Sequence, residues 1–205
     1  MRQARQGEEI TTLDNNRYKL DKNVLLIADK EGPLAIAGIK GGKRAEVRKT
    51  TRRIIVEAAN FDRLSIYQSS RKLDLVTDAS ARFGHGLNPG LAEVGMDRAS
   101  ALLRDLVNAK SLGQEDVYPR KQAERTIGFD INKFNRITGL ELNVKTATDY
   151  LRRLGFEIKG RKKLLVGVPF LRNDINIFED LVEEVARLYG YNEINPLSPI
   201  AILQT

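Results

Sequence analysis

The segment at residues 111–122, SLGQEDVYPRKQ, interrupts the apolar periodicity that runs through the sequence on both sides of it. Such a break is typical of the boundary between two domains. A chain of 205 residues can bury one sizeable hydrophobic core or two small ones. We therefore expect two folded parts, residues 1–112 and 123–195, joined by a linker at 113–122.

The composition excludes several kinds of site. The sequence has no cysteine, which excludes disulfides, zinc–thiolate sites and cysteine nucleophiles, and His85 is its only histidine. The longest purely aliphatic run, at residues 24–28, is too short to cross a membrane. The N-terminal stretch MRQARQGEEI lacks the apolar core of a signal peptide. We therefore expect a cytoplasmic protein without a membrane segment.

The first part of the sequence predicts a sheet followed by helices. Apolar runs at 24–29 and 33–39 are separated by Lys-Glu-Gly and predict a β-hairpin, and the run at 52–59 predicts a third strand. Apolar residues recur every three or four positions from Leu91 to Leu106, and this spacing predicts an amphipathic helix. The expected elements after the third strand are a helix at 61–73, a loop or short helix at 77–86 and a helix at about 89–107.

The second part predicts a compact domain of short helices with a small hairpin. Asn143 is a typical N-cap residue and should begin one of these helices. The expected elements are a strand at 125–129, a helix at 130–139, a helix after Asn143, a hairpin around Gly160–Lys163 and a last helix at about 177–188. This order is similar in outline to a winged helix. The tail, residues 196–205, is expected to be the truncated start of a further module.

The charge of the chain favours a polyanionic partner. The formal net charge is +7, and residues 40–53 contain seven basic side chains and one acidic one. Such a run can follow the phosphates of a nucleic acid. A solvated basic surface is the alternative. No aromatic residue lies within the run, so a platform that stacks bases is not indicated.

The opposite charge gathers near the C-terminus, where five carboxylates lie between residues 174 and 184 without a basic residue among them. On a helix, Asp180, Glu183 and Glu184 share one face, and Asp174 could fold back toward it. Oxygen ligands of this kind suit Mg²⁺. The alternative is an acidic helix N-terminus that Arg187 and other bases neutralise.

Two groups of motifs resemble one family. The first comprises GPLAIAGIKGG (32–42), VEAANFDRLSI (56–66) and TDASARFGHGLNP (77–89), and the second is FLRNDINIFEDLVEEVARLYGYNEIN (170–195). In this order they look like the beta subunit of bacterial phenylalanyl-tRNA synthetase. The resemblance implies an α+β chain: a partial α/β domain, the C-terminal half of a tRNA-editing domain, followed by a small winged-helix-like α+β domain.

The resemblance also implies a function and its residues. The family ligates phenylalanine to its tRNA with ATP and hydrolyses mischarged Tyr-tRNA, because a phenylalanine pocket cannot strongly exclude an added hydroxyl. Glu57 would accept the hydrogen bond of the tyrosine hydroxyl, and Gly41, Thr77 and Ala79 would line the editing pocket. The resemblance assigns four magnesium ligands that this chain would share with the alpha subunit: Asp174, Asp180, Glu183 and Glu184.

The same resemblance implies partners: the alpha subunit, in a heterotetramer of two alpha and two beta subunits, and tRNA. The ATP and aminoacylation sites would lie outside this chain, so no catalytic residue is assigned here and the isolated chain is expected to be inactive. Lys40, Ala81, Gly84 and His85 depart from the residues usual in the family, which puts editing in doubt. His85 as a general base, a non-catalytic RNA-binding or scaffold module and a free-standing editing hydrolase are the alternatives.

Overall fold

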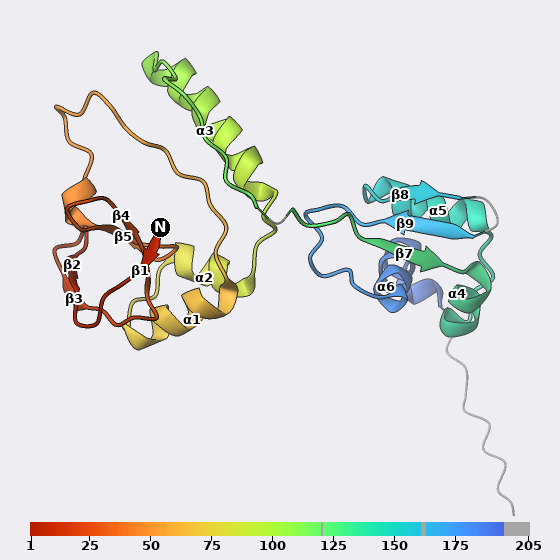
Figure 1. Cartoon of the computed structure of the whole chain (residues 1–205). Helices are drawn as coiled ribbons and strands as arrows, with labels where there is room; N and C mark the ends of the chain where they lie inside the picture. The colour runs from red at the N-terminus through yellow and green to blue at the C-terminus, as the bar shows by residue number, and fades with distance from the viewer. Residues whose placement is uncertain (120, 161–162, 195–205) are drawn as a thin grey trace, which may run out of the picture. The chain divides into compact units, whose positions relative to one another are not determined.

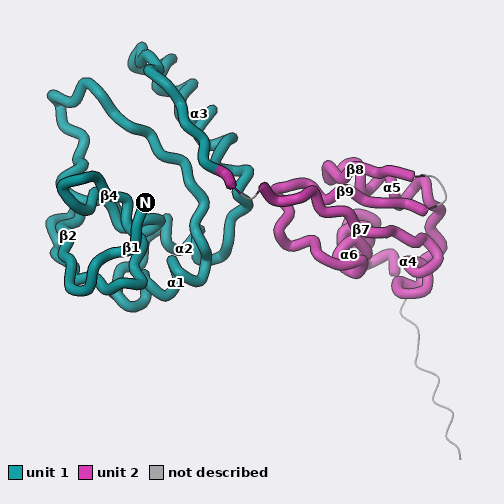
Figure 2. The backbone as a smooth tube through the Cα atoms, in the orientation of Figure 1, with its two compact units in different colours: residues 1–117 teal, residues 118–205 magenta. Residues whose placement is uncertain are grey.

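The structure is a computed structural model that describes residues 1–119, 121–160 and 163–194. It divides into two compact units, Met1–Val117 and Tyr118–Thr205 (Figure 2). The division falls inside the segment at 113–122 where we expect a linker. Both units combine helices with antiparallel strands (Figure 1), which confirms the predicted α+β class. Within the described residues, no helix has the length and apolar character needed to cross a membrane.

Unit 1 contains a small sheet and a separate strand pair. The sheet has the order β1-β4-β5-β6 and the pair is β2-β3. The predicted hairpin is confirmed as β4 and β5, which pair antiparallel with Leu26 opposite Ile36. Strands of two or three residues show no alternation in a sequence, and for this reason four of the six were missed. The six strands are β1 (Arg2–Gln3), β2 (Glu9–Thr11), β3 (Arg17–Lys19), β4 (Leu25–Ala28), β5 (Pro33–Ile36) and β6 (Lys40–Gly41).

Three helices follow in unit 1: α1 (Arg63–Lys72), α2 (Asp78–His85) and α3 (Leu91–Val107). The Asp62 carboxylate accepts the backbone N–H of Ser65 and caps α1. Ile66 of α1 is fully buried and joins Leu26 and Ile36 of the sheet in one hydrophobic core. The core of unit 1 therefore lies between the strands and α1.

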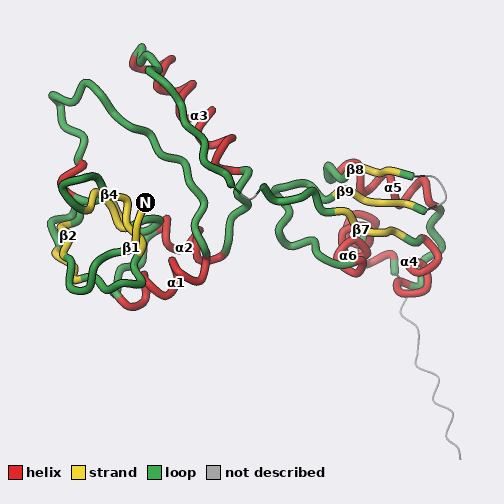
Figure 3. The backbone as a smooth tube through the Cα atoms, in the orientation of Figure 1, coloured by secondary structure: helices red, strands yellow, loops and turns green. Residues whose placement is uncertain are grey.

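One expectation for unit 1 is wrong. Residues 51–60 form no strand (Figure 3), and Ile55 within them is 99% exposed. Apolar β-branched residues favour a strand only where a neighbouring strand offers hydrogen bonds, and β6 already pairs with the edge of β5. The long helix forms as predicted, but none of the residues of α3 is buried. Its apolar face therefore does not pack in the core of unit 1.

In its described residues, unit 2 contains a three-stranded antiparallel sheet with the order β7-β9-β8 and three α-helices. These elements confirm the predicted strand, helices and hairpin, although residues 161 and 162 of the hairpin lie outside the described part. The elements are β7 (Thr126–Phe129), α4 (Ile131–Thr138), α5 (Val144–Arg153), β8 (Glu157–Lys159), β9 (Leu164–Gly167) and α6 (Phe178–Tyr189). The winged-helix outline stays a prediction, and residues 196–205 lie outside the described part.

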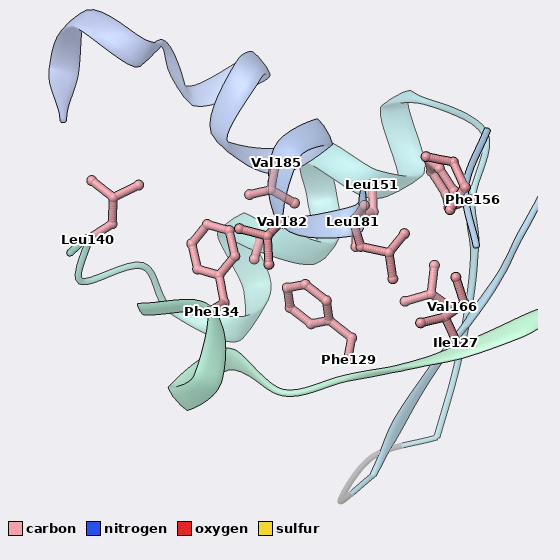
Figure 4. Packing of buried hydrophobic residues seen from close by; sticks show 12 residues of the cluster. Ile127, Phe129, Phe134, Leu140, Leu151, Phe156, Val166, Leu181, Val182 and Val185 are labelled. Carbon is pink, nitrogen blue, oxygen red and sulfur yellow. The ribbon is translucent and has the colours of Figure 1, made fainter. Parts of the chain in front are cut away.

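Local signals explain where the helices of unit 2 begin and end. The Asn143 side chain accepts the backbone N–H of Thr146, which confirms the predicted cap of α5. Gly139 ends α4 at φ 72°, a left-handed conformation that glycine adopts without strain. Phe134, Leu151 and Leu181, from three different helices, are fully buried and pack together with residues of the sheet (Figure 4). Unit 2 therefore has a core that all of its elements share.

Candidate functional site

A pocket of about 450 Å³ opens in unit 1. Strand residues, the extended segment at 57–61, helix α2 and the start of α3 contribute to its walls. Most of its lining side chains are apolar, and Lys40 and Glu57 supply two charges. Such a mixture of an apolar wall and a few polar groups is typical of sites that bind small molecules.

Three of the four predicted editing residues, Gly41, Glu57 and Ala79, line this pocket together. Thr77 lies behind the wall: its hydroxyl donates a hydrogen bond of 2.8 Å to the carbonyl oxygen of Ile39, which does line the pocket. The same hydroxyl accepts the backbone N–H of Ser80 and caps α2, the helix that carries Ala79. The structure thus gives Thr77 a supporting position.

Gly41 and Gly42 are needed because the neighbouring protein atoms leave little space for a side chain, and not because they make room for a ligand. A Cβ atom on Gly41 would lie 2.9 Å from Cδ1 of Leu13, a flexible side chain. A Cβ atom on Gly42 would lie 2.5 Å from the carbonyl oxygen of Leu34, a backbone atom that cannot move aside. Glycine is therefore required more strictly at position 42 than at position 41. The absence of a side chain at Gly42 lets the backbone just after β6 approach β5 closely.

Glu57 has an unusual electrostatic environment. The residue is exposed as a whole, yet the surrounding protein desolvates its carboxylate and raises the pKa above its ordinary value. The α-amino group of Met1 acts in the opposite direction, toward a lower pKa. Among the described residues, no charged side chain forms an ion pair with this carboxylate, so it can accept a hydrogen bond from a ligand.

Two aromatic residues of the pocket were missed by sequence reasoning. The rings of Phe61 and Phe83 lie 5.0 Å apart between centroids in an edge-to-face arrangement, and both line the pocket. Phe61 comes before α1 and Phe83 lies on α2. Phe83 stands in the motif TDASARFGHG, and this was the available signal. The pair supplies an apolar wall suited to an aromatic ligand.

Lys40, a departure from the family pattern, lines the pocket, and its side chain is 29% exposed. Its ammonium lies 3.3 Å from a carboxylate oxygen of Asp14. The Thr12 hydroxyl, followed by Lys40, lowers the pKa of Asp14 to about 2. His85 lies at the end of α2, where its Nδ1 is 2.7 Å from the carbonyl oxygen of Ala81, and it is not among the pocket residues. The general-base role of His85 therefore stays a prediction without support from its position.

The predicted magnesium ligands lie in unit 2, where a basic side chain that sequence reasoning overlooked joins two of them. Arg172 donates to both carboxylate oxygens of Asp174 and to both of Glu184, over distances between 2.6 and 3.2 Å. Arg187 donates a further hydrogen bond of 2.7 Å to Glu184, in agreement with the predicted neutralisation. Arg172, with Arg187 in second place, lowers the pKa of Glu184.

The remaining two carboxylates have different surroundings. One oxygen of Asp180 accepts the backbone N–H groups of Asn176 and Ile177 and so caps the start of α6. Glu183 is exposed, whereas the adjacent Glu184 is 7% exposed. Across residues 1–119, 121–160 and 163–194, no three histidine or carboxylate side chains converge as a metal site would require. Asp174 and Glu184 are thus held by arginines and Asp180 by backbone N–H groups, whereas Glu183 is exposed.

The basic run at 40–53 is partly neutralised. Lys40 pairs with Asp14, Lys43 with Glu46, and Arg44 with Asp29 and Glu31. Phosphate contacts, if this run makes them, depend mainly on the basic residues at 48–53.

Two family models match the chain. The model described as B3/4 domain matches residues 1–108, and the model described as tRNA synthetase B5 domain matches residues 127–191. The first match contains the whole pocket and the second contains the acidic cluster. The two matches lie in unit 1 and unit 2, respectively.

Curated relatives carry the same combination over part of their length. The phenylalanine–tRNA ligase beta subunit of Clostridium acetobutylicum is 46% identical over 195 residues, which is 93% of this chain and 24% of that protein. The beta subunit of Carboxydothermus hydrogenoformans is 37% identical, over 100% of this chain and 26% of that protein. The chain thus spans about a quarter of the length of these relatives.

Among solved structures, an N-terminal fragment of the phenylalanyl-tRNA synthetase beta subunit from Pyrococcus horikoshii has 16% sequence identity and a TM-score of 0.48, and the match covers 92% of this chain and 55% of that one. The sequence relatives and the two family models carry the assignment. The chain belongs to the B3/4 domain family, continues into a tRNA synthetase B5 domain, and is homologous to phenylalanine–tRNA ligase beta subunits.

Proposed function

We propose that the pocket of unit 1 binds the side chain of tyrosine wrongly attached to tRNA, as the editing pocket of a phenylalanine–tRNA ligase beta chain. The observation that supports this proposal is the position of Glu57, an unpaired and partly desolvated carboxylate on a wall that also contains Phe61 and Phe83. The phenyl ring would contact the apolar wall. The phenolic O–H, the one group that distinguishes tyrosine from phenylalanine, would donate to Glu57.

In this arrangement the pocket would discriminate tyrosine from phenylalanine by a hydrogen bond rather than by size. A hydrogen bond to a charged group stabilises a complex by about 1.5–3 kcal/mol, on the order of a tenfold preference or more. Phenylalanine would leave the desolvated carboxylate of Glu57 without a partner. The residues of this chain therefore bind and orient the substrate, and no nucleophile or general base is assigned among them.

The larger functions belong to the same proposal. On the basis of the homology to beta subunits, the proposal includes phenylalanine attachment with ATP, assembly with an alpha subunit as a heterotetramer, and a cytoplasmic location. The sites for attachment and for ATP would lie outside this chain. The chain alone is expected neither to charge tRNA nor to clear Tyr-tRNA at a useful rate. Weak, salt-sensitive tRNA binding through the basic residues at 48–53 is expected.

The magnesium site that the resemblance implies has to be weighed against the surroundings of its ligands. Carboxylates are suitable donors for Mg²⁺. However, Glu184 lies between the guanidinium groups of Arg172 and Arg187, and Asp174 shares Arg172 with it. A divalent cation would meet two positive charges at the same oxygens. The four acids as placed in this chain do not fit a Mg²⁺ site, and no part of the proposed function depends on one.

The editing proposal can be tested by ligand binding. Saturation-transfer NMR would measure binding of L-tyrosine methyl ester and L-phenylalanine methyl ester to the purified chain. We expect a preference for the tyrosine ester of roughly tenfold, lost in Glu57→Gln and kept in the control Glu141→Gln, an exposed acid of unit 2. Equal binding of the two esters would contradict the proposal. Rapid deacylation of Tyr-tRNA by the chain alone, abolished by Glu57→Ala, would instead support the free-standing hydrolase.

The pH dependence of this preference follows from the charge of Glu57. Because the pKa of Glu57 is raised, its carboxylate becomes protonated at a higher pH than an ordinary glutamate. The α-amino group of Met1 is the neighbouring cation that favours the charged form. The preference for the tyrosine ester should therefore decline as the pH falls through this raised pKa.

A further inference from the structure

The pocket of unit 1 contains a positive charge that the proposed recognition of tyrosine does not use. Lys40 of β6 lines the pocket together with Glu57, and among the described lining residues it is the one basic side chain. The two charges do not neutralise each other, because Lys40 forms its ion pair with Asp14. A ligand in this pocket therefore meets an ammonium group as well as a carboxylate.

Asp14 holds the side chain of Lys40 in a defined place. The Lys40 ammonium lies 3.3 Å from one carboxylate oxygen of Asp14, and the same oxygen accepts a hydrogen bond of 3.1 Å from the side-chain amide of Asn16. The other oxygen accepts the hydroxyl of Thr12, a fully buried residue. Asp14 is thus fixed by two further donors. A lysine held by such a carboxylate loses less side-chain entropy when it binds a ligand.

The backbone, and not the side chain of Lys40, builds this wall of the pocket. Strand β6 pairs with β5, with Lys40 opposite Ile36. The turn that carries Asp14 is joined to β6 by a hydrogen bond of 3.0 Å from the N–H of Leu13 to the carbonyl oxygen of Gly41. A substitution of the Lys40 side chain should therefore leave the wall in place, so that its effect on binding can be measured.

The chemistry of the ammonium group decides what Lys40 can bind. An ammonium has three N–H donors, and the ion pair with Asp14 occupies one of them. The others can donate to an oxygen of a ligand, most strongly to an anionic one. In an aminoacyl ester at the end of a tRNA, the amino group is positive and the ester and ribose are neutral. The phosphate of the terminal nucleotide is the anionic group.

We propose that Lys40 is a substrate-binding residue that holds the phosphate of the terminal nucleotide of the tRNA while the tyrosine side chain lies in the pocket. This inference rests on the proposed function and adds a second recognised group to the same site. Glu57 would bind the amino acid and Lys40 the nucleotide that carries it. The basic residues at 48–53 would supply general attraction to the phosphate backbone, whereas Lys40 makes one defined contact.

The test compares two stable analogues of the tRNA end, 3′-tyrosylamino-3′-deoxyadenosine with and without a 5′-phosphate. Calorimetry with the purified chain should show that the phosphate strengthens binding by roughly tenfold, because it adds a charge-assisted hydrogen bond. Lys40→Met should lose this gain and Lys40→Arg should keep most of it. The matched control is Lys43→Met, which removes a nearby lysine that pairs with Glu46 and does not line the pocket. Added salt should reduce the gain.

The corresponding phenylalanyl analogues separate this inference from the proposed function. The gain from the phosphate should be the same for both amino acids, since Lys40 does not contact the phenolic hydroxyl in this arrangement. Equal binding of tyrosyl and phenylalanyl analogues, with the gain retained, would therefore contradict the role of Glu57 and leave that of Lys40 standing.

Three results would overturn the role of Lys40. The first is equal affinity of the wild-type chain for the analogues with and without the phosphate. The second is a gain that Lys40→Met keeps and that the double variant Arg52→Gln, Arg53→Gln loses, which would assign the phosphate to the basic run. The third is tighter binding of L-tyrosine than of its methyl ester, lost in Lys40→Met, together with no effect of the phosphate. Lys40 would then bind the carboxylate of a free amino acid.

Discussion

Helices α6 and α3 both carry apolar residues at helical spacing, yet their surroundings differ. Helix α6, with 12 residues, buries Leu181, Val182, Glu184, Val185 and Ala186, whereas α3, with 17 residues, buries none. The sheet and two other helices of unit 2 supply the packing partners of α6. The difference shows that an amphipathic sequence predicts a helix and the face it presents, while burial depends on which other segments are present.

The same contrast separates the two candidate sites. In unit 2 three of the four predicted ligands, Asp174, Asp180 and Glu184, are satisfied by arginines or backbone N–H groups of the same unit. In unit 1 the Glu57 carboxylate has no such partner and lies at an open pocket. Unit 2 therefore satisfies most of these acids internally, whereas unit 1 leaves a carboxylate at an open pocket.

The largest expected effect tests whether unit 2 is self-contained. Phe134→Ala removes a ring that is fully buried in the shared core and should cost unit 2 about 3–5 kcal/mol. The control Phe170→Ala removes the same atoms at a site that is 48% exposed and should cost much less. Hydrogen exchange with peptide resolution would follow both units. If Phe134→Ala reduced the protection of unit 1 as much as that of unit 2, the two units would not fold independently.

The next effect separates a structural role of the acids from a metal-binding one. Glu184→Gln removes the charge that two arginines share and should cost roughly 1.5–3 kcal/mol in the stability of unit 2. The adjacent and exposed Glu183→Gln should change it by less than about 0.5 kcal/mol. Urea unfolding of both variants, with and without millimolar Mg²⁺, provides the measurement.

The outcome that would contradict this structural role is a different ranking. If Mg²⁺ stabilised the wild-type chain and both substitutions abolished that stabilisation equally, the acids would act together on a cation. Co-expression of the same variants with an alpha subunit would then show whether the cation joins the two chains.

A smaller effect of pH is expected in unit 1. The Arg2 guanidinium and the backbone N–H of Arg5 each donate a hydrogen bond to the Glu8 carboxylate. The pKa of Glu8 is lowered to about 2, and the hydrogen bond from Arg2 is the largest cause. A lowered pKa in the folded state stabilises the fold above the unfolded value of about 4.5, and this contribution is lost as the pH falls toward 2. Since the Glu8 side chain is 14% exposed, roughly 1–2 kcal/mol is expected.

Urea unfolding at pH 6 and pH 3 measures whether the stability of unit 1 falls with pH as expected. The wild-type chain should lose more stability between the two pH values than Glu8→Gln does. An exposed control, Glu9→Gln, whose side chain is 54% exposed, should behave as the wild type does. An equal loss in Glu8→Gln and wild type would show that other groups cause the acid sensitivity of this unit.

Residue patterns predicted most helices and the hairpins, because caps and periodicity are local properties. Asn143, Gly139 and the run from Leu91 to Leu106 each indicated a helix boundary or face from nearby residues alone. The strand expected at 52–59 was wrong because a strand requires hydrogen bonds from a segment far away in the sequence or in another chain. The shortest strands of unit 1 contain too few residues to show any pattern.

The candidate site was predicted through family resemblance more than through physics. Gly41, Glu57 and Ala79 do meet at one pocket. No local pattern could have paired Phe61 with Phe83, since the contact depends on how α1 and α2 pack. The role of Arg172 was missed because its two carboxylate partners lie 2 and 12 residues away, and the second distance becomes contact only through the turn before α6.

The smallest expected effect concerns an exposed leucine of α3, compared with a buried leucine in a helix of unit 2. Leu106→Gln in α3 should change the stability of the chain alone by less than about 0.5 kcal/mol, because Leu106 is 75% exposed and both residues have similar helix propensities. The same substitution at Leu151 of α5, which is fully buried, should destabilise unit 2 strongly. Hydrogen exchange with peptide resolution measures both variants, and a Leu106→Gln variant that loses the protection of α3 would show that α3 is covered by its own unit.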